Sequence, residues 1–290
     1  EYLTCNPDKG CICDGPPVIT GISPVGGFCE EDSGRACISD SDCVTACDTD
    51  TPSGVAGNLI TIFGKNFGEY EEAASKVLFE GGNREGVAPS DLNPACIDTW
   101  RDDQIVIAIP EGASTGAIQV TNRDNLSDST GDGYGPAIRD FEPTSLSRPG
   151  LCYLDPNRGV LSSEVGYQGL NLFSSQAYFG NYQNNVQALE SQFTQAQGLE
   201  GRALTPNINN GDSGSFVQKP AASGYVRSNF LRFTKEAEEG EGPYISSFAP
   251  ASGAPGQYVT LRGHGFGGGR GASRVDRKST RLNSSHTIQS

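Results

Sequence analysis

The 290-residue chain contains no methionine, one tryptophan and two histidines. Because it also lacks a positively charged start followed by an apolar segment, we expect residue 1 to be an interior point of a longer protein. No stretch approaches the roughly 18 consecutive apolar residues of a membrane helix, so no membrane insertion is expected within these residues. Helical periodicity is missing too, apart from a weak stretch at 186–199 that is either a short helix or a polar loop.

Basic residues are scarce, since 21 Lys and Arg stand against 35 Asp and Glu and the formal net charge is −14. This acidity opposes nonspecific attraction to nucleic acid or anionic membrane, so we predict no nucleic-acid partner. Residues 276–286 read DRKSTRLNSSH, which matches a translated sequencing-adapter oligonucleotide. We therefore interpret 276–290 as foreign sequence; because that tail carries +2, residues 1–275 carry −16.

A repeated unit is the main positive signal in the chain. Three segments, LITIFGKNFG at 59–68, EVGYQGLNLF at 164–173 and YVTLRGHGFG at 258–267, share alternating apolar residues followed by a glycine. Alternation with a period of two predicts strands, and the glycine permits a turn that folds an apolar side chain back over the strand end. The paired apolar residues are Ile60/Ile62, Val165/Tyr167 and Val259/Leu261. The glycines are Gly64, Gly169 and Gly263, and the residues expected to fold back are Phe67, Leu172 and Phe266.

Each repeat is expected to open on a Pro-x-Ile segment, at Pro17, Pro136 and Pro243. Their spacing of roughly 110 residues predicts two complete all-β domains and a truncated third. The expected boundaries are 1–15 for a cysteine-bearing linker or the end of a preceding module, 16–125 for domain 1 with a cysteine-rich insertion at 26–51, 126–135 for an acidic linker, 136–234 for domain 2, 235–242 for a second linker, and 243–275 for the truncated domain 3.

The order of these segments resembles a known family. PVITGISP, PSGVAGNLITIFGKNFG, KVLFEGG and QIVIAIPEGASTGAIQVTN are similar to the IPT/TIG domain of plexins, some transcription factors and many bacterial surface proteins. The similarity covers nearly all of 16–122, is looser over 136–234, and reaches the opening third of the domain over 243–268. It implies tandem immunoglobulin-like β-sandwiches with no catalytic residues common to the family.

Nine cysteines are distributed unevenly, with seven before residue 50 and only Cys96 and Cys152 after it. In an acidic β-rich chain this clustering favours disulfides and an extracellular or cell-surface location. The spacings lack the paired C-x2-C of zinc sites, and an odd number leaves at least one cysteine unpaired or bonded elsewhere. The insertion shows no strand signal, so cross-links would have to order it. The expected disulfide cysteines, of unknown pairing, are Cys5, Cys11, Cys13, Cys29, Cys37, Cys43 and Cys47.

Two motifs resemble enzyme signatures but occupy places where the repeat predicts turns. GDSGS at 211–215 is similar to the nucleophile neighbourhood of chymotrypsin-like proteases, yet His264 follows it and falls in another repeat. GHGFGG at 263–268 satisfies GxGxxG, but no βαβ pattern surrounds it. We therefore predict no catalytic, cofactor-binding or metal-site residues, and no enzyme activity for these residues.

Two weaker binding hypotheses remain open. Acidic clusters could hold calcium at a domain junction, although solvated linker charge is the simpler interpretation. An aromatic group could form a sugar platform, although burial is the usual fate of such side chains. The acidic residues are Asp40, Asp42, Asp48 and Asp50 in one cluster and Asp124, Asp128 and Asp132 in the other, and the aromatic residues are Trp100, Tyr178, Phe179 and Tyr182.

The expected function is a non-catalytic spacer, stalk or adhesion segment of a larger extracellular protein, with an unidentified protein or carbohydrate partner. The alternative is a set of accessory modules from a secreted polysaccharide-active enzyme whose catalytic domain lies outside these residues.

Overall fold

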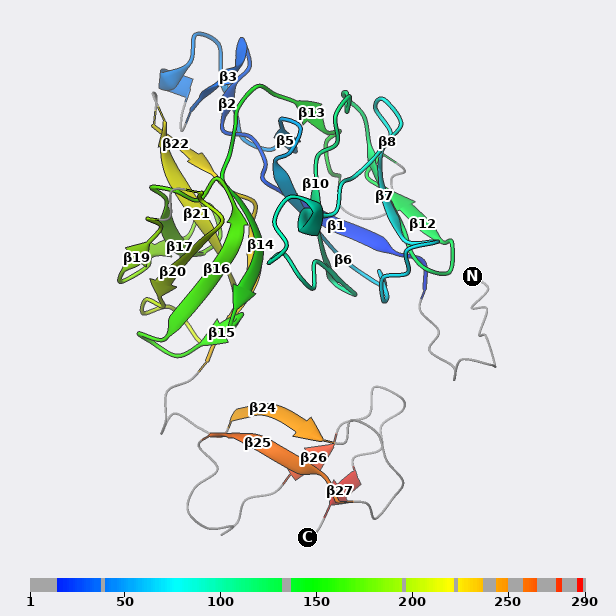
Figure 1. The fold of residues 1–290 in the computed structure, drawn as a ribbon, viewed down its shortest axis with the longest axis vertical. Coiled ribbons are helices and arrows are strands. Elements are labelled where there is room, and N and C mark those ends of the chain that lie inside the picture. The colour runs from blue at the N-terminus through cyan, green and yellow to red at the C-terminus, as the bar shows by residue number, and fades with distance from the viewer. Residues whose placement is uncertain are drawn as a thin grey trace.

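The computed structural model describes residues 15–37, 40–131, 137–194, 197–221, 224–236, 244–249, 258–264, 275–277 and 286–288. This part of the chain is nearly all β and forms immunoglobulin-like sandwiches, which confirms the predicted fold class (Figure 1). Its helical elements are two short 3-10 turns, η2 (Asp40–Asp42) and η3 (Pro89–Asp91). No helix in the described ranges is long and apolar enough to cross a bilayer.

We call the first sandwich domain 1. Its first sheet has the order β1 (Val18–Ser23), β6 (Leu59–Lys65), β10 (Gln104–Ala108), β9 (Trp100–Arg101). Its second sheet has the order β12 (Ser127–Ser129), β11 (Ile118–Thr121), β7 (Lys76–Phe79), β8 (Arg84–Glu85). Ile60 and Ile62 point into the core between these sheets, as the period of two predicts. Phe67 folds back over the strand end, where a Cβ on Gly64 would lie 2.3 Å from its ring.

The second sandwich, domain 2, repeats this strand order. One sheet has the order β14 (Gly150–Asp155), β16 (Glu164–Leu170), β20 (Glu200–Leu204), β19 (Ser191–Gln192). The other has the order β15 (Arg158–Gly159), β23 (Leu231–Lys235), β21 (Gly211–Ala221), β17 (Gln176–Gly180), β18 (Asn185–Gln187), with β22 (Gly224–Arg227) paired to β21. The stretch at 186–199 therefore contributes short strands in its described part, not a helix.

The expected opening of domain 2 at Pro136 is wrong. The strand that pairs with the glycine strand is β14, in which Leu151 lies opposite Gly169, just as Ile19 lies opposite Gly64 in domain 1. A register shift follows at the same place in both pairs. The equivalent of PVITGISP is thus PGLCYLDP at 149–156, which the Pro-x-Ile pattern missed because leucine stands in the third position.

The segment expected to open domain 2 belongs to domain 1 instead. Phe141 is buried in the domain 1 core, and Ile138 packs against it. The short strand β13 (Glu142–Pro143) pairs in parallel with β5 (Ser53–Gly54). Pro136 itself lies outside the described residues.

The cysteine-rich insertion also contains strands that the sequence did not signal. β2 (Phe28–Cys29) lies between β3 (Asp32–Ala36) and β4 (Cys47–Asp48) in a small antiparallel sheet. These strands are too short to show any periodicity, so only their pairing reveals them.

The third repeat contributes one strand pair, β24 (Tyr244–Ala249) with β25 (Thr260–His264). Ile245 lies opposite Gly263, which is the register of the two preceding repeats. Phe266 lies outside the described residues. In and next to the segment interpreted as foreign sequence, β26 (Val275–Arg277) and β27 (His286–Ile288) pair with each other.

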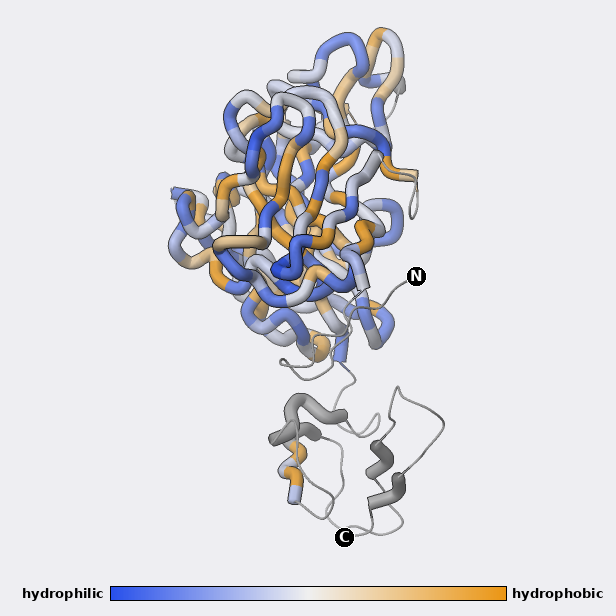
Figure 2. The backbone as a smooth tube through the Cα atoms, turned by 90° about the vertical axis from the view of Figure 1, so that its right-hand side faces the viewer, coloured by the Kyte–Doolittle hydropathy of each residue, from blue (hydrophilic) through white to orange (hydrophobic). Residues whose placement is uncertain are grey.

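Apolar residues concentrate along the inner strands of the two sandwiches, and hydrophilic residues along the peripheral loops (Figure 2). One apolar cluster fills domain 1. The other fills domain 2 but includes four buried residues of domain 1, namely Leu59, Cys96, Val106 and Ala108. The core of domain 2 is therefore continuous with one face of domain 1.

Candidate functional site

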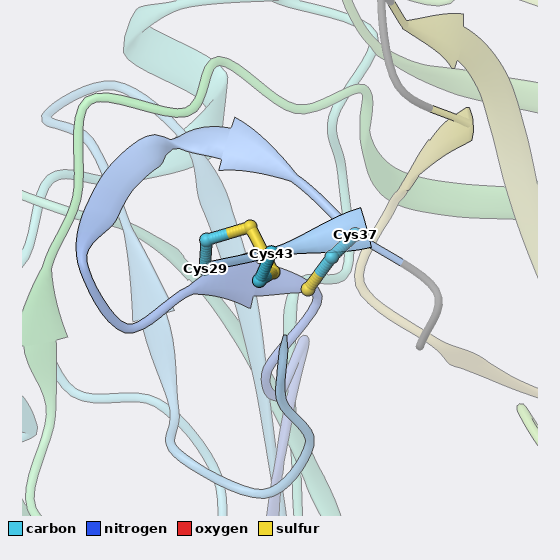
Figure 3. Close-up of side chains that lie close together, drawn as sticks. All are labelled: Cys29, Cys37 and Cys43. Atoms are coloured by element: carbon cyan, nitrogen blue, oxygen red, sulfur yellow. A yellow bond between two sulfur atoms is a disulfide. The ribbon is translucent and has the colours of Figure 1, made fainter. Parts of the chain in front are cut away.

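Two disulfides hold the insertion. Cys29 bonds to Cys43 and Cys37 to Cys47, with Cα atoms 5.5 and 5.8 Å apart. Figure 3 shows the first bond with Cys37 beside it. The sulfurs of Cys29, Cys37 and Cys43 lie within 4.8 Å of one another, but all three are in disulfides and have no thiolate to offer a metal. The other expected disulfide cysteines, Cys5, Cys11 and Cys13, lie outside the described residues.

Glu31 orders the loop that the disulfides close. Its carboxylate accepts hydrogen bonds from the backbone N–H of Val44 and from the backbone and hydroxyl of Thr45. These bonds, that of the Thr45 hydroxyl above all, lower the pKa of Glu31 from 4.5 to about 2. The loop is therefore held by an ionised carboxylate at neutral pH.

The insertion packs against domain 2 rather than extending into solvent. Phe28 and Ala36 form a small apolar cluster with Leu146, which precedes β14, and with Val226 of β22. The insertion of domain 1 therefore forms a second contact with domain 2, in addition to the contact between the two sandwiches.

A third disulfide, Cys96–Cys152, joins the two sandwiches directly. Cys96 follows η3 in domain 1, Cys152 lies in β14, and both are buried with Cα atoms 5.3 Å apart. We did not expect this pair. The available signal was that these two cysteines stand alone outside the clustered seven.

Buried amides complete the junction. The Asn229 side chain donates to Thr61 Oγ1 and to the Leu151 carbonyl, each at 2.7 Å, and accepts from the Leu151 N–H, also at 2.7 Å. In the reverse direction, Asn93 Nδ2 of domain 1 donates to the Gly169 carbonyl of domain 2 at 2.9 Å. Both asparagines are buried, so these bonds satisfy groups that water cannot reach.

The rim of the junction is polar. Arg232 pairs with Asp103 at 3.2 Å, and its backbone N–H donates to Gln104 Oε1 at 3.0 Å. The Arg232 guanidinium also lies 5.3 Å from the centre of the Phe63 ring. Since the ion pair is about half exposed on both sides, it contributes little to stability compared with the buried amides.

Arg148 is a buried cation where domain 1, the insertion and domain 2 meet. Its guanidinium donates to the Gly26 carbonyl and to Ser53 Oγ, and its Nε has no hydrogen-bond partner. Burial, with a smaller contribution from the nearby charge of Arg227, lowers its pKa from 12.5 to about 10, while Tyr182 and Asp48 oppose this shift. Arg148 therefore remains protonated at neutral pH.

The acidic clusters use their buried carboxylates as acceptors. Asp48 accepts from the Thr51 N–H and hydroxyl, and Arg139 lies 3.8 Å from Asp48 and 3.1 Å from Asp50. In the other cluster, Asp128 accepts from the Ile19 N–H at 2.6 Å. Asp132 lies outside the described residues, and calcium binding stays a prediction.

The aromatic residues separate into two environments. Phe179 is fully buried in the core and matches Phe79 of domain 1, as expected. Trp100 is half-buried and packs beside Tyr70 at 5.5 Å between ring centres. Tyr178 and Tyr182 contact Phe216 on the outer face of the second sheet of domain 2, and the Tyr182 hydroxyl also hydrogen-bonds to Ser23 Oγ of domain 1 at 2.7 Å. Burial raises the pKa of Tyr182 to about 12.

The protease-like motif lies within β21 and not in a turn before a strand, which corrects its expected place. Ser215 is fully buried and hydrogen-bonds to the Tyr167 hydroxyl at 2.7 Å and to the Tyr178 carbonyl at 3.0 Å. His264 lies in β25, opposite Tyr244.

Comparison with protein-family models and with curated proteins finds no match. Among solved structures, a protein crystallised with a xylogluco-oligosaccharide is 16% identical over 76% of this chain and 40% of its own, with a TM-score of 0.24. The γ-CGTase of alkalophilic Bacillus clarkii is 14% identical over 77% of this chain and 26% of its own, with a TM-score of 0.26. A tandem of titin immunoglobulin domains is 9% identical over 77% of this chain and 100% of its own, with a TM-score of 0.19.

The chain spans less than half the length of the first two of these proteins. At such scores the likenesses carry no argument about ligand or activity. The assignment to immunoglobulin-like sandwiches follows from the strand order of the two domains.

Proposed function

We propose that this chain is a non-catalytic segment of a larger extracellular or cell-surface protein, in which the two sandwiches form one rigid spacer or adhesive stalk. The observation that supports this most is the junction, where an apolar cluster shared by both domains is crossed by the Cys96–Cys152 disulfide. Interfaces between domains of one chain are commonly polar and permit relative motion. A covalent bond across an apolar contact favours a fixed angle instead.

The extracytoplasmic location rests on the cysteines. Three disulfides form among the described residues, and such bonds persist in oxidising compartments, whereas cytosolic thiols are kept reduced. We expect Cys29, Cys37, Cys43, Cys47, Cys96 and Cys152 to resist alkylation of the native secreted chain without reductant. Six freely reactive thiols would contradict this location.

Calorimetry and distance measurements on the full chain test the rigid pair. We expect domains 1 and 2 to unfold in one transition, because unfolding of either domain would expose the apolar junction residues of the other to water. Spin labels at the exposed residues Glu85 and Glu200, placed without adding cysteines, should give one narrow distance distribution. Two separate transitions for the two domains, or a broad distribution in the oxidised chain, would refute the proposal.

The alternative function, as accessory modules of a secreted polysaccharide-active enzyme, is favoured by one observation. Domain 2 exposes tyrosine and arginine side chains together on the outer face of its second sheet. Binding of this chain to a polysaccharide would support that function, and it is compatible with a rigid pair.

A further inference from the structure

The outer face of the second sheet of domain 2 brings aromatic, amide and arginine side chains side by side. Strand pairing places Tyr178 opposite both Phe216 and Gln187, and Gln218 opposite Arg227. Side chains two apart on a strand share a face, so Tyr225 lies on the same side as Arg227. We call Tyr178, Tyr182, Gln187, Phe216, Tyr225 and Arg227 the tyrosine–arginine face.

This face lies opposite the hydrophobic core. Ala177, Phe179 and Val217 alternate with its members along β17 and β21 and belong to the domain 2 core. The outer side of an antiparallel sheet is ordinarily polar where it meets water. At one end of this face the junction with domain 1 accounts for Tyr182, whose hydroxyl hydrogen-bonds to Ser23 Oγ and donates to the Ser228 carbonyl. Among the described residues no hydrogen bond to domain 1 accounts for Tyr178 or Tyr225.

Packing arranges the rings in a defined way. Tyr178 stacks on Phe216 with ring centres 5.5 Å apart and planes 17° apart, and Tyr182 meets Phe216 edge-on at 4.9 Å. Phe216 is fully buried beneath them, whereas Tyr178 is half-buried and Tyr225 is 47% exposed. Rigid, partly exposed tyrosines of this kind offer flat apolar surface at little cost in conformational entropy.

Arg227 is free to bind a ligand. Its guanidinium lies 5.4 Å from the centre of the Tyr182 ring, and it forms no ion pair or hydrogen bond with the described residues. By contrast, five other arginines of the described residues pair with carboxylates, namely Arg101, Arg123, Arg139, Arg202 and Arg232. The buried Arg148 lies near enough to Arg227 for the two charges to act on each other.

We propose that the tyrosine–arginine face binds a uronic-acid residue of an acidic polysaccharide. The sugar ring stacks on the exposed tyrosines, its carboxylate pairs with Arg227, and the exposed Gln187 amide bonds to its hydroxyls. The planar guanidinium fork binds a carboxylate through two parallel hydrogen bonds, a charged contact that a neutral sugar cannot form. Because charges beyond about 8 Å are largely screened at 0.15 M salt, the overall acidity of the chain does not prevent this contact.

Calorimetric titration of the full chain with polygalacturonate, in 0.15 M salt with EDTA to prevent calcium bridging, tests the proposal. Dextran serves as the neutral polymer and dextran sulfate, which carries no carboxylate, as the sulfated one. We expect binding to polygalacturonate at least about tenfold tighter than to dextran, since a hydrogen-bonded charge pair is worth about that factor, and no weaker than to dextran sulfate. Arg227→Gln should lose about tenfold or more and Tyr225→Ala several-fold.

The matched control is Arg84→Gln, which removes an exposed arginine from β8 of domain 1 and should leave binding unchanged. Thermal unfolding of each variant shows whether the fold is kept. If Arg227→Gln destabilises the chain, Arg227→Lys replaces it, and should bind less tightly because it keeps the charge but loses the fork.

Four outcomes would overturn the proposal: no binding to polygalacturonate, equal binding to dextran, tighter binding to dextran sulfate, or equal loss in Arg227→Gln and Arg84→Gln. None of them affects the rigid-pair proposal, which depends on the junction and is measured by unfolding and distance.

Discussion

The first sheets of domains 1 and 2 have the same strand order, but their outer faces differ in residue type and in burial. When Gly64 is matched with Gly169, the apolar outer residues Leu59 and Val106 of domain 1 correspond to the charged Glu164 and Arg202 of domain 2. Leu59, Thr61, Val106 and Ala108 of domain 1 are buried by domain 2; their counterparts Glu164, Gly166, Arg202 and Leu204 are exposed or half-exposed.

The difference shows that a shared fold does not imply a shared way of joining neighbours. Close packing of β14 on β6, where a Cβ on Gly150 would lie 2.9 Å from Leu59 Cγ, buries the outer face of domain 1. On domain 2 the same position carries the Arg202–Glu164 ion pair and a hydrogen bond from Arg202 to Gln192. The contact that joins domains 1 and 2 therefore cannot be repeated on this face of domain 2.

The largest difference between the two outer faces should appear when a charge is introduced into the buried face of domain 1 and a charge is removed from the exposed face of domain 2. Val106→Asp places an unpaired carboxylate in the junction and should cost about 3–5 kcal/mol of unfolding free energy. Arg202→Val changes the matched position of domain 2 and should stay within about 0.5 kcal/mol, because that side chain is exposed. Urea unfolding of the full chain measures both; similar costs would show that the two faces are alike.

Removing the interdomain disulfide should have the next largest effect. Cys96→Ala with Cys152→Ala opens a separation of 56 residues and should cost about 4 kcal/mol, if stabilisation follows chain entropy. Cys29→Ala with Cys43→Ala, which span 14 residues, should cost about 3 kcal/mol. Equal or reversed costs, measured by urea unfolding, would mean that the junction restrains the chain no more than the insertion does.

Asn229→Ala tests the buried amide of the junction. It leaves the Leu151 backbone groups unpaired away from water and should cost about 1–3 kcal/mol. The rim variant Arg232→Ala, at a half-exposed ion pair, should cost less than about 1 kcal/mol. Thermal unfolding ranks the two, and a larger loss at the rim would contradict the assignment of stability to the buried part.

The smallest effect concerns pH and the insertion. Because the folded pKa of Glu31 is about 2 and its ordinary value is 4.5, the carboxylate stabilises the loop above about pH 4.5. This contribution is lost as pH falls toward 2. The protection of the Val44 and Thr45 amides against hydrogen exchange, relative to the intrinsic rate at each pH, should fall over that range. In Glu31→Gln this protection should already be low at neutral pH, and protection that does not respond to either change would exclude this role of Glu31.

Much of the fold could be predicted from local patterns. Alternation at Ile60 and Ile62, repeated at Val165 and Tyr167, predicts strands because side chains on a strand point to opposite faces in turn. The folding back of Phe67 was also predicted, but for another reason: Gly64 lies inside β6 and leaves room for the ring, while the left-handed residue of the turn is Asn66.

The opening of domain 2 was assigned to the wrong segment because two stretches offered a proline and a branched apolar residue. Which of them pairs with β16 depends on hydrogen bonds to residues far along the chain. The strands of the insertion and the tyrosine–arginine face were missed for the same reason, since both consist of cross-strand neighbours.

By itself, the sequence determined the all-β class, the repeated strand–glycine–turn unit and the cysteine-rich insertion, since each depends on residues near one another in the chain. Only the tertiary structure decided that Cys96 meets Cys152, that Asn229 spans the junction, and that domain 2 covers the outer face of domain 1. The alternation of apolar residues shows which face of a strand points into its own sandwich. What covers the outer face depends on the docking of a sheet from another domain.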